Sequence, residues 1–250
     1  MKTYFSLTLC LLLILGLTNS SHTAHHEEEN KETPNYDNRK PERFDKAIQR
    51  FKNTDKENPP PEGAIVGIGS SSMAGWRHTI REDLSPLTII PRGFGGSNMN
   101  DALHFADDIV IAYNPRAVIL YEGDNDMMLD ISLESYKEKF DAFVTKIHTA
   151  LPQTRIYVLS IKPSIARWKV WPRMQSANKL LEEACKTNEL LTYIDIGTVM
   201  LNKQGNPKKE IFKKDMLHMN EKGYALWTNA VRPIVLKTEL QYEQASTETK

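Results

Sequence analysis

The sequence predicts an α/β fold in which a parallel sheet carries helices on both faces. Beyond a run of three prolines at 59–61, short apolar segments alternate with longer segments that have amphipathic helical spacing. The apolar segments provide five strand candidates: Ala64–Ile68, Leu87–Pro91, Ala117–Tyr121, Arg155–Ile161 and Leu191–Ile196. Apolar strands separated by helices are typical of a parallel sheet that is buried on both faces. Because such sheets bind ligands beyond the carboxyl ends of their strands, the residues after each strand are candidates for a site.

Length and charge limit the classes of function. The chain has 250 residues, which is enough for one domain with a substantial core. Its 32 Lys and Arg residues equal its 32 Asp and Glu residues, so no global basic field attracts nucleic acid or an anionic membrane. We therefore expect no nucleic-acid partner.

The first 20 residues have the pattern of a secretory signal peptide. Lys2 is followed by an apolar run from Phe5 to Leu17 and then by small polar residues suited to cleavage. The run is short for a membrane span, and Cys10 lies inside it, whereas a lipoprotein anchor needs a cysteine after it. We expect a secreted or periplasmic protein with no stable membrane anchor. Cleavage leaves Cys185 as the only cysteine of the mature chain and permits no internal disulfide.

A tether and a docking helix are predicted next. Residues 21–41 are polar and charged and have little to bury, which indicates a flexible polar tether. Phe44, Ile48 and Phe51 then recur at helical spacing, which predicts a helix over 42–58 whose apolar stripe docks on the domain behind it. The prolines that follow end this helix.

The remaining helices set the C-terminal boundary of the domain. Three further segments show the spacing of amphipathic helices: 133–150, 174–188 and 220–237. We place the domain at 42–238 and expect residues 239–250 to form a polar C-terminal tail.

Hydroxyl groups follow the first strand candidate, and glycines follow the second. Ser70, Ser71 and Ser72 can be presented to a ligand at the strand end, although serines are equally good turn formers and helix caps. The loop 92–98 contains three glycines that let backbone N–H groups point at a ligand. It lacks the GxGxxG pattern and the P-loop lysine, and an ordinary tight loop is the alternative.

An amide and an imidazole–carboxylate pair lie at the same edge of the predicted sheet. Asn125 follows the third strand candidate and can hold an oxyanion or form an Asx turn. Its neighbours Asp124 and Asp126 would disfavour anionic substrates, or else they bond local backbone. Asp215 precedes His218 by three residues, so its carboxylate can orient the imidazole as in a serine hydrolase triad. A surface pair without a catalytic role is the alternative.

The segment 162–173 after the fourth strand candidate is long and aromatic. Arg167, Trp168 and Trp171 are its candidate substrate contacts, on the leaving-group side of a site. Packing of the two indole rings against the sheet is an equally good interpretation.

The first of these blocks resembles the SGNH, or GDSL-type, hydrolase family. The segment IGSSSMAGW resembles the family's first block, and alignment on Gly69 and Trp76 places the nucleophile at Ser71. Ser70 stands where the family usually has an aspartate. This departure is shared by a GSSS-bearing branch that resembles platelet-activating-factor acetylhydrolases and lysophospholipase-type esterases.

The other blocks follow in the family's order. Gly96 matches the second-block glycine, Asn125 matches the third-block asparagine, and Asp215 with His218 matches the DxxH block. The resemblance covers roughly residues 42–236. It implies a flavodoxin-like three-layer α/β/α sandwich with a five-stranded parallel sheet.

The resemblance also implies a reaction and the residues that perform it. It implies ester hydrolysis through an acyl-enzyme on Ser71, with His218 as the base, Asp215 orienting it, and no metal or organic cofactor. The oxyanion is then held by the backbone N–H groups of Ser71 and Gly96 and by the side-chain amide of Asn125. The expected substrate is a small-molecule ester with a small acyl group, acetyl above all, or a lysophospholipid-type ester. The alternatives are a carbohydrate acetylesterase that acts on glycan esters of decorated polysaccharide, and a catalytically silent ligand-binding protein of the same fold.

Overall fold

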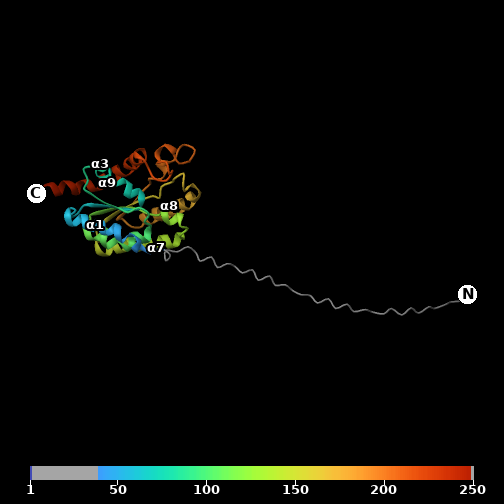
Figure 1. The fold of residues 1–250 in the computed structure, drawn as a ribbon, viewed down its shortest axis with the longest axis horizontal. Coiled ribbons are helices and arrows are strands. Elements are labelled where there is room, and N and C mark those ends of the chain that lie inside the picture. Colours follow the sequence, from blue (N-terminus) through green and yellow to red (C-terminus); the bar gives the residue numbers. More distant parts are fainter. Residues whose placement is uncertain (2–38, 249–250) are drawn as a thin grey trace. The chain divides into compact units, whose positions relative to one another are not determined.

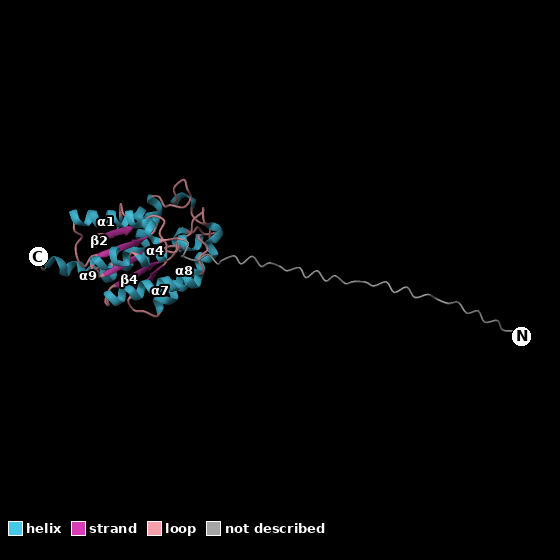
Figure 2. Cartoon of the chain, turned by 60° about the horizontal axis from the view of Figure 1, so that its bottom comes forward, coloured by secondary structure: helices cyan, strands magenta, loops and turns pink. Residues whose placement is uncertain are grey.

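Five parallel strands form one sheet, in the order β2-β1-β3-β4-β5. Figure 2 shows the strands lying among the helices. The computed structural model describes residue 1 and residues 39–248, so the predicted signal peptide and most of the predicted tether lie outside the described part. The strands are β1 Ile65–Gly69, β2 Ile89–Gly93, β3 Ala117–Tyr121, β4 Arg155–Leu159 and β5 Leu191–Ile194. All five predicted strands are confirmed, but β2 begins and ends two residues later than predicted. Its register with β1, which pairs Ile65 with Ile89 and Gly69 with Gly93, sets these limits.

Helices cover both faces of the sheet. Successive side chains of a strand point to opposite faces, so Val118 and Leu120 of β3 join one core cluster while Ile119 and Tyr121 join the other. Helices α1 and α7 lie on one side of the sheet, and α3 and α9 lie on the other (Figure 1). The predicted three-layer α/β/α sandwich is therefore confirmed.

The described helical segments have the following bounds: η2 Pro41–Phe44, α1 Asp45–Glu57, α2 Ser71–Trp76, α3 Ile80–Asp83, α4 Met99–His104, α5 Ala106–Ile109, η3 Ile111–Tyr113, α6 Asp124–Met128, α7 Leu133–Ala150, η4 Trp168–Val170, α8 Trp171–Lys186, η5 Thr198–Met200, η6 Lys209–Ile211 and α9 Glu221–Glu248. None of the described helices has the length and apolar character needed to cross a membrane.

The segment expected to dock forms η2 and α1. Ile48 is buried, and Phe44 meets Phe94 edge-on with ring centroids 5.1 Å apart. An ion pair of 2.5 Å between Asp55 and Arg92 fixes the other end of α1 to the end of β2. Because Phe94 belongs to the loop that follows β2, η2 and α1 together pack against the carboxyl edge of the sheet.

The last helix is longer than its sequence pattern indicates. α9 continues through the boundary at 238, where the sequence predicts a polar tail. Glu239 has no exposed surface and accepts hydrogen bonds from Arg116 Nε at 3.0 Å, Arg155 Nε at 2.6 Å and Tyr157 Oη at 2.7 Å. The polar side chain thus faces arginines at the amino ends of β3 and β4. Glu239 belongs to the segment that the sequence predicts as a polar tail, but in the fold it forms buried ion pairs with Arg116 and Arg155.

Glu239→Ala is therefore expected to destabilise the protein by about 3 kcal/mol, because it leaves two arginines without their buried carboxylate. Urea unfolding of the wild type and the variant measures this difference. Gln241→Ala is the matched control, since its exposed side chain lies on the same helix. Equal losses of stability in the two variants would contradict the structural role of Glu239.

Candidate active site

Ser71 lies at the carboxyl end of the sheet, where β1 passes into α2. β1 ends at Gly69, and Ser71 is the first residue of α2. Gly69 has φ +149°, and a Cβ atom there would lie 2.1 Å from the carbonyl oxygen of Tyr121. Only glycine permits this close crossing of the end of β3. The crossing presents Ser71 between the loops that follow β2 and β3.

His218 joins Ser71 to Asp215 in a continuous chain of hydrogen bonds. The Nε2 atom of His218 lies 3.0 Å from Ser71 Oγ, and Nδ1 lies 2.7 Å from Asp215 Oδ2. Since a carboxylate can only accept, Nδ1 carries the proton and Nε2 is free to accept the Ser71 hydroxyl proton. The alternative of a surface pair without a serine partner does not describe this arrangement.

Asp215 is held ionised and fixed in orientation. Its Oδ1 accepts hydrogen bonds from the backbone N–H groups of Leu217 at 3.0 Å and His218 at 2.9 Å. The hydrogen bond from the His218 ring, together with these backbone bonds, holds the pKa of Asp215 well below its usual range. The carboxylate is therefore available to stabilise a positively charged imidazole.

The two serines that flank Ser71 are more deeply buried than Ser71. Ser70 and Ser72 are buried, whereas Ser71 is half-buried. The Oγ atom of Ser70 lies 3.5 Å from Asp124 Oδ1. Of the three hydroxyls, Ser71 is the one placed against His218, which favours the register taken from the sequence.

The glycine loop after β2 lies beside Ser71 and is hydrogen-bonded to Asn125. A Cβ atom on Gly95 would lie 3.7 Å from Ser71 Cβ, so the loop after β2 runs next to the serine. Gly96 has φ +90°, in the region that favours glycine. Asn125 donates from Nδ2 to the carbonyl oxygen of Ser97 at 2.7 Å. This bond joins the first turn of α6 to the loop after β2, so the Asn125 side chain does not form the local Asx turn considered as its alternative role.

One protein family matches residues 62–226. This span includes the five positions taken from the family motifs: Ser71, Gly96, Asn125, Asp215 and His218. The matching family is the GDSL-like Lipase/Acylhydrolase family. The chain belongs to this family. The resemblance stated from the sequence motifs is confirmed, and the family is one of acylhydrolases and esterases.

Solved structures place this GDSL-like protein in the same fold as several bacterial proteins. A protein from Streptococcus pneumoniae, provisionally named a platelet activating factor, superposes with a TM-score of 0.68 at 21% identity, over 77% of this chain and 93% of its own. A GDSL-like lipase from Bacteroides thetaiotaomicron gives 0.66 at 18% identity, over 76% and 97%. An acetyl-xylooligosaccharide esterase from Geobacillus gives 0.54 at 12% identity, over 68% and 93%. A search of curated proteins gives no match.

The acidic neighbours of Asn125 are paired in this GDSL-like protein. Asp124 lies 3.7 Å from Lys162 Nζ and 3.4 Å from Arg167 Nη1. Asp126 accepts a hydrogen bond from the backbone N–H of Met99 at 3.0 Å. Asp124 therefore faces cations, and Asp126 binds a helix N-terminus distant in sequence. Neither presents a bare charge that would repel an anionic substrate.

The three candidate substrate contacts have other partners within the GDSL-like domain. Arg167 donates from Nη2 to Asn125 Oδ1 at 2.9 Å. Trp168 and Trp171 stack on each other with ring centroids 6.0 Å apart, and both pack against the core, where Trp171 is buried. The indole rings thus follow the packing interpretation, and Arg167 acts on a neighbouring side chain.

Lys162 is the site residue that sequence reasoning missed. It directly follows the strand candidate that ends at Ile161, and its side chain is only 1% exposed. Its Nζ atom donates to the carbonyl oxygen of Leu217, the residue before His218, at 3.0 Å. A lysine at the end of a strand that is buried on both faces was the available signal.

Among the described residues there is no group of three or more His, Cys, Asp or Glu side chains that could hold a metal ion.

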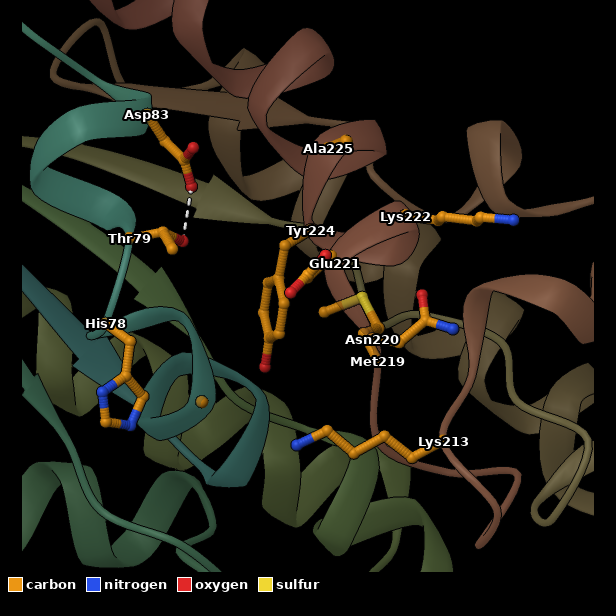
Figure 3. Close-up of a pocket in the computed structure, with 11 residues that line it drawn as sticks. His78, Thr79, Asp83, Lys213, Met219, Asn220, Glu221, Lys222, Tyr224 and Ala225 are labelled. Atoms are coloured by element: carbon orange, nitrogen blue, oxygen red, sulfur yellow. Dashed lines mark hydrogen bonds between the residues drawn. The ribbon is translucent and has the colours of Figure 1, made fainter.

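A pocket of about 690 Å³ lies between the segment 75–83 and the first turn of α9 (Figure 3). Its lining includes Gly75, which shares helix α2 with Ser71, and Met219, which follows His218. Tyr224 projects into it from the first turn of α9 (Figure 3). Ser71, Asp215 and His218 are not among the described residues that line it.

Proposed function

We propose that this chain is a secreted serine esterase that hydrolyses carboxylic esters with small acyl groups, through an acyl-enzyme on Ser71. The observation that carries this proposal is the chain of hydrogen bonds from Ser71 through His218 to Asp215. A hydroxyl, a base and a carboxylate in series are the arrangement that activates a serine nucleophile. A silent binding protein would have no need of it. Export is supported by the signal-peptide pattern of residues 1–20.

The geometry supports a two-step reaction. Ser71 Oγ attacks the ester carbonyl carbon while its proton passes to His218 Nε2, and the tetrahedral intermediate collapses as that proton passes to the departing alkoxide oxygen. A water molecule then attacks the acyl carbon and gives its proton to the same nitrogen. That proton returns to Ser71 Oγ as the carboxylic acid departs.

Donors for the developing oxyanion come from three elements. They are the backbone N–H of Ser71 at the start of α2, the backbone N–H of Gly96 after β2, and the side-chain amide of Asn125 in α6. Donors of this kind are worth about 3 kcal/mol each in other serine hydrolases.

For the alcohol part of the ester, two classes are compatible with this site. The first is a small or lysophospholipid-type alcohol. The second is a sugar, as in the acetyl-xylooligosaccharide substrate of the Geobacillus protein with the same fold.

The purified protein without residues 1–20 is expected to hydrolyse p-nitrophenyl acetate and butyrate faster than octanoate, and to be labelled by a fluorophosphonate probe. Mass spectrometry of the labelled peptide should locate the adduct on Ser71. Acetate release from acetylated xylooligosaccharide, measured beside fatty-acid release from lysophosphatidylcholine, distinguishes the two alcohol classes. A protein that neither turns over these esters nor reacts with the probe would instead be the silent binding protein.

A further inference from the structure

Two basic side chains after β4 converge on the first turn of α6, which carries Asn125. Lys162 and Arg167 both approach Asp124, whose side chain is 3% exposed. Arg167 is 16% exposed, and its guanidinium reaches past Asp124 to the amide of Asn125. Lys162 also holds the carbonyl oxygen of Leu217. One cluster of side chains therefore contacts both the loop of the proposed base and the proposed oxyanion donor.

The Asn125 amide is held at both ends. Its Oδ1 accepts from Arg167 Nη2 at 2.9 Å, and one N–H of Nδ2 is used by the carbonyl oxygen of Ser97 at 2.7 Å. Arginine has five N–H donors and no acceptor, so the reversed orientation would set N–H groups against N–H groups. A planar amide fixed in this way has one N–H left, in a defined direction.

We propose that Arg167 is a positioning residue that fixes the Asn125 amide in the orientation in which its remaining N–H meets the oxyanion. A permanently charged guanidinium on Oδ1 also withdraws electron density from the amide and makes this N–H a stronger donor. The catalytic contribution of Arg167 therefore passes through Asn125. This inference rests on the function proposed above.

A double-mutant cycle tests the inference, with p-nitrophenyl acetate as substrate and kcat and KM measured separately. Asn125→Ala is expected to lower kcat by about 10²-fold. Arg167→Met should lower kcat by roughly tenfold or more with KM nearly unchanged, and Arg167→Lys should recover only part of the loss because it lacks the planar fork. When Asn125 is already alanine, Arg167→Met should lower kcat by less than about twofold.

Arg173→Met is the matched control. Arg173 belongs to the neighbouring helix α8 and donates to the carbonyl oxygen of Ile131, not to Asn125. Its loss should leave kcat unchanged, and urea unfolding of each variant shows whether the fold is retained. Equal kcat losses from Arg167→Met in the presence and absence of Asn125 would overturn the inference, and so would an Arg167→Met enzyme of wild-type kcat. In both of these results the wild type is still an active esterase, so only the inference about Arg167 fails. An inactive wild type would overturn the proposed function as well.

Discussion

Ser71→Ala is expected to lower kcat for p-nitrophenyl acetate by about 10⁵-fold or more and to abolish labelling by a fluorophosphonate. The substitution removes the atom that forms the acyl-enzyme, and removal of a nucleophile in a triad costs on this order in serine hydrolases. Because the oxyanion donors and the pocket remain, KM should change little. If the wild type releases a burst of p-nitrophenol in a stopped-flow measurement, Ser71→Ala should show no such burst.

The adjacent serines provide the controls for this prediction. Ser70→Ala removes a buried hydroxyl that lies near Asp124, and Ser72→Ala removes a buried hydroxyl on α2. Neither is placed against His218, so each should retain labelling and lose less than tenfold in kcat. Normal activity in Ser71→Ala, with activity abolished in one of the other two, would move the nucleophile to that serine.

Asp215→Asn is expected to lower kcat by about 10⁴-fold, the size found when the orienting carboxylate of a triad becomes an amide. The two backbone N–H groups that now bond Oδ1 would hold the amide oxygen of the asparagine. Its NH2 group would then face His218 Nδ1. That nitrogen must become the acceptor, which moves the ring proton to Nε2 and blocks acceptance of the Ser71 proton.

Lys214→Gln is the control for this substitution, because the exposed side chain of Lys214 precedes Asp215 in the same loop. Its kcat should equal that of the wild type. The lowered pKa of Asp215 adds a pH expectation: its ionic contribution is complete above the ordinary aspartate pKa of about 3.9 and is lost only as the pH falls through the lowered value. Retention of more than a tenth of wild-type kcat in Asp215→Asn, at any pH above about 5, would contradict the assigned role of the carboxylate.

The elements with a clear local signal were predictable from the sequence. β3 and α7 have the bounds predicted for them, because a continuous apolar run and a helical repeat are properties of neighbouring residues. The meeting of the segments that carry Ser71 and Asn125 was also predictable, because they follow the neighbouring parallel strands β1 and β3, whose carboxyl ends lie at one edge of the sheet.

Contacts between distant polar side chains were settled only by the tertiary structure. From the sequence, Glu239 was predicted to belong to a polar tail. In the structure it accepts hydrogen bonds from Arg116 and Arg155. From the sequence, Arg167 was a candidate substrate contact. In the structure its guanidinium donates a hydrogen bond to Asn125. The sequence by itself determined the order of strands and helices along the chain and the chemical groups at the sheet edge. The tertiary structure decided which charged group pairs with which, because a charged side chain carries no periodic signal of its partner and its burial depends on segments far away in the chain.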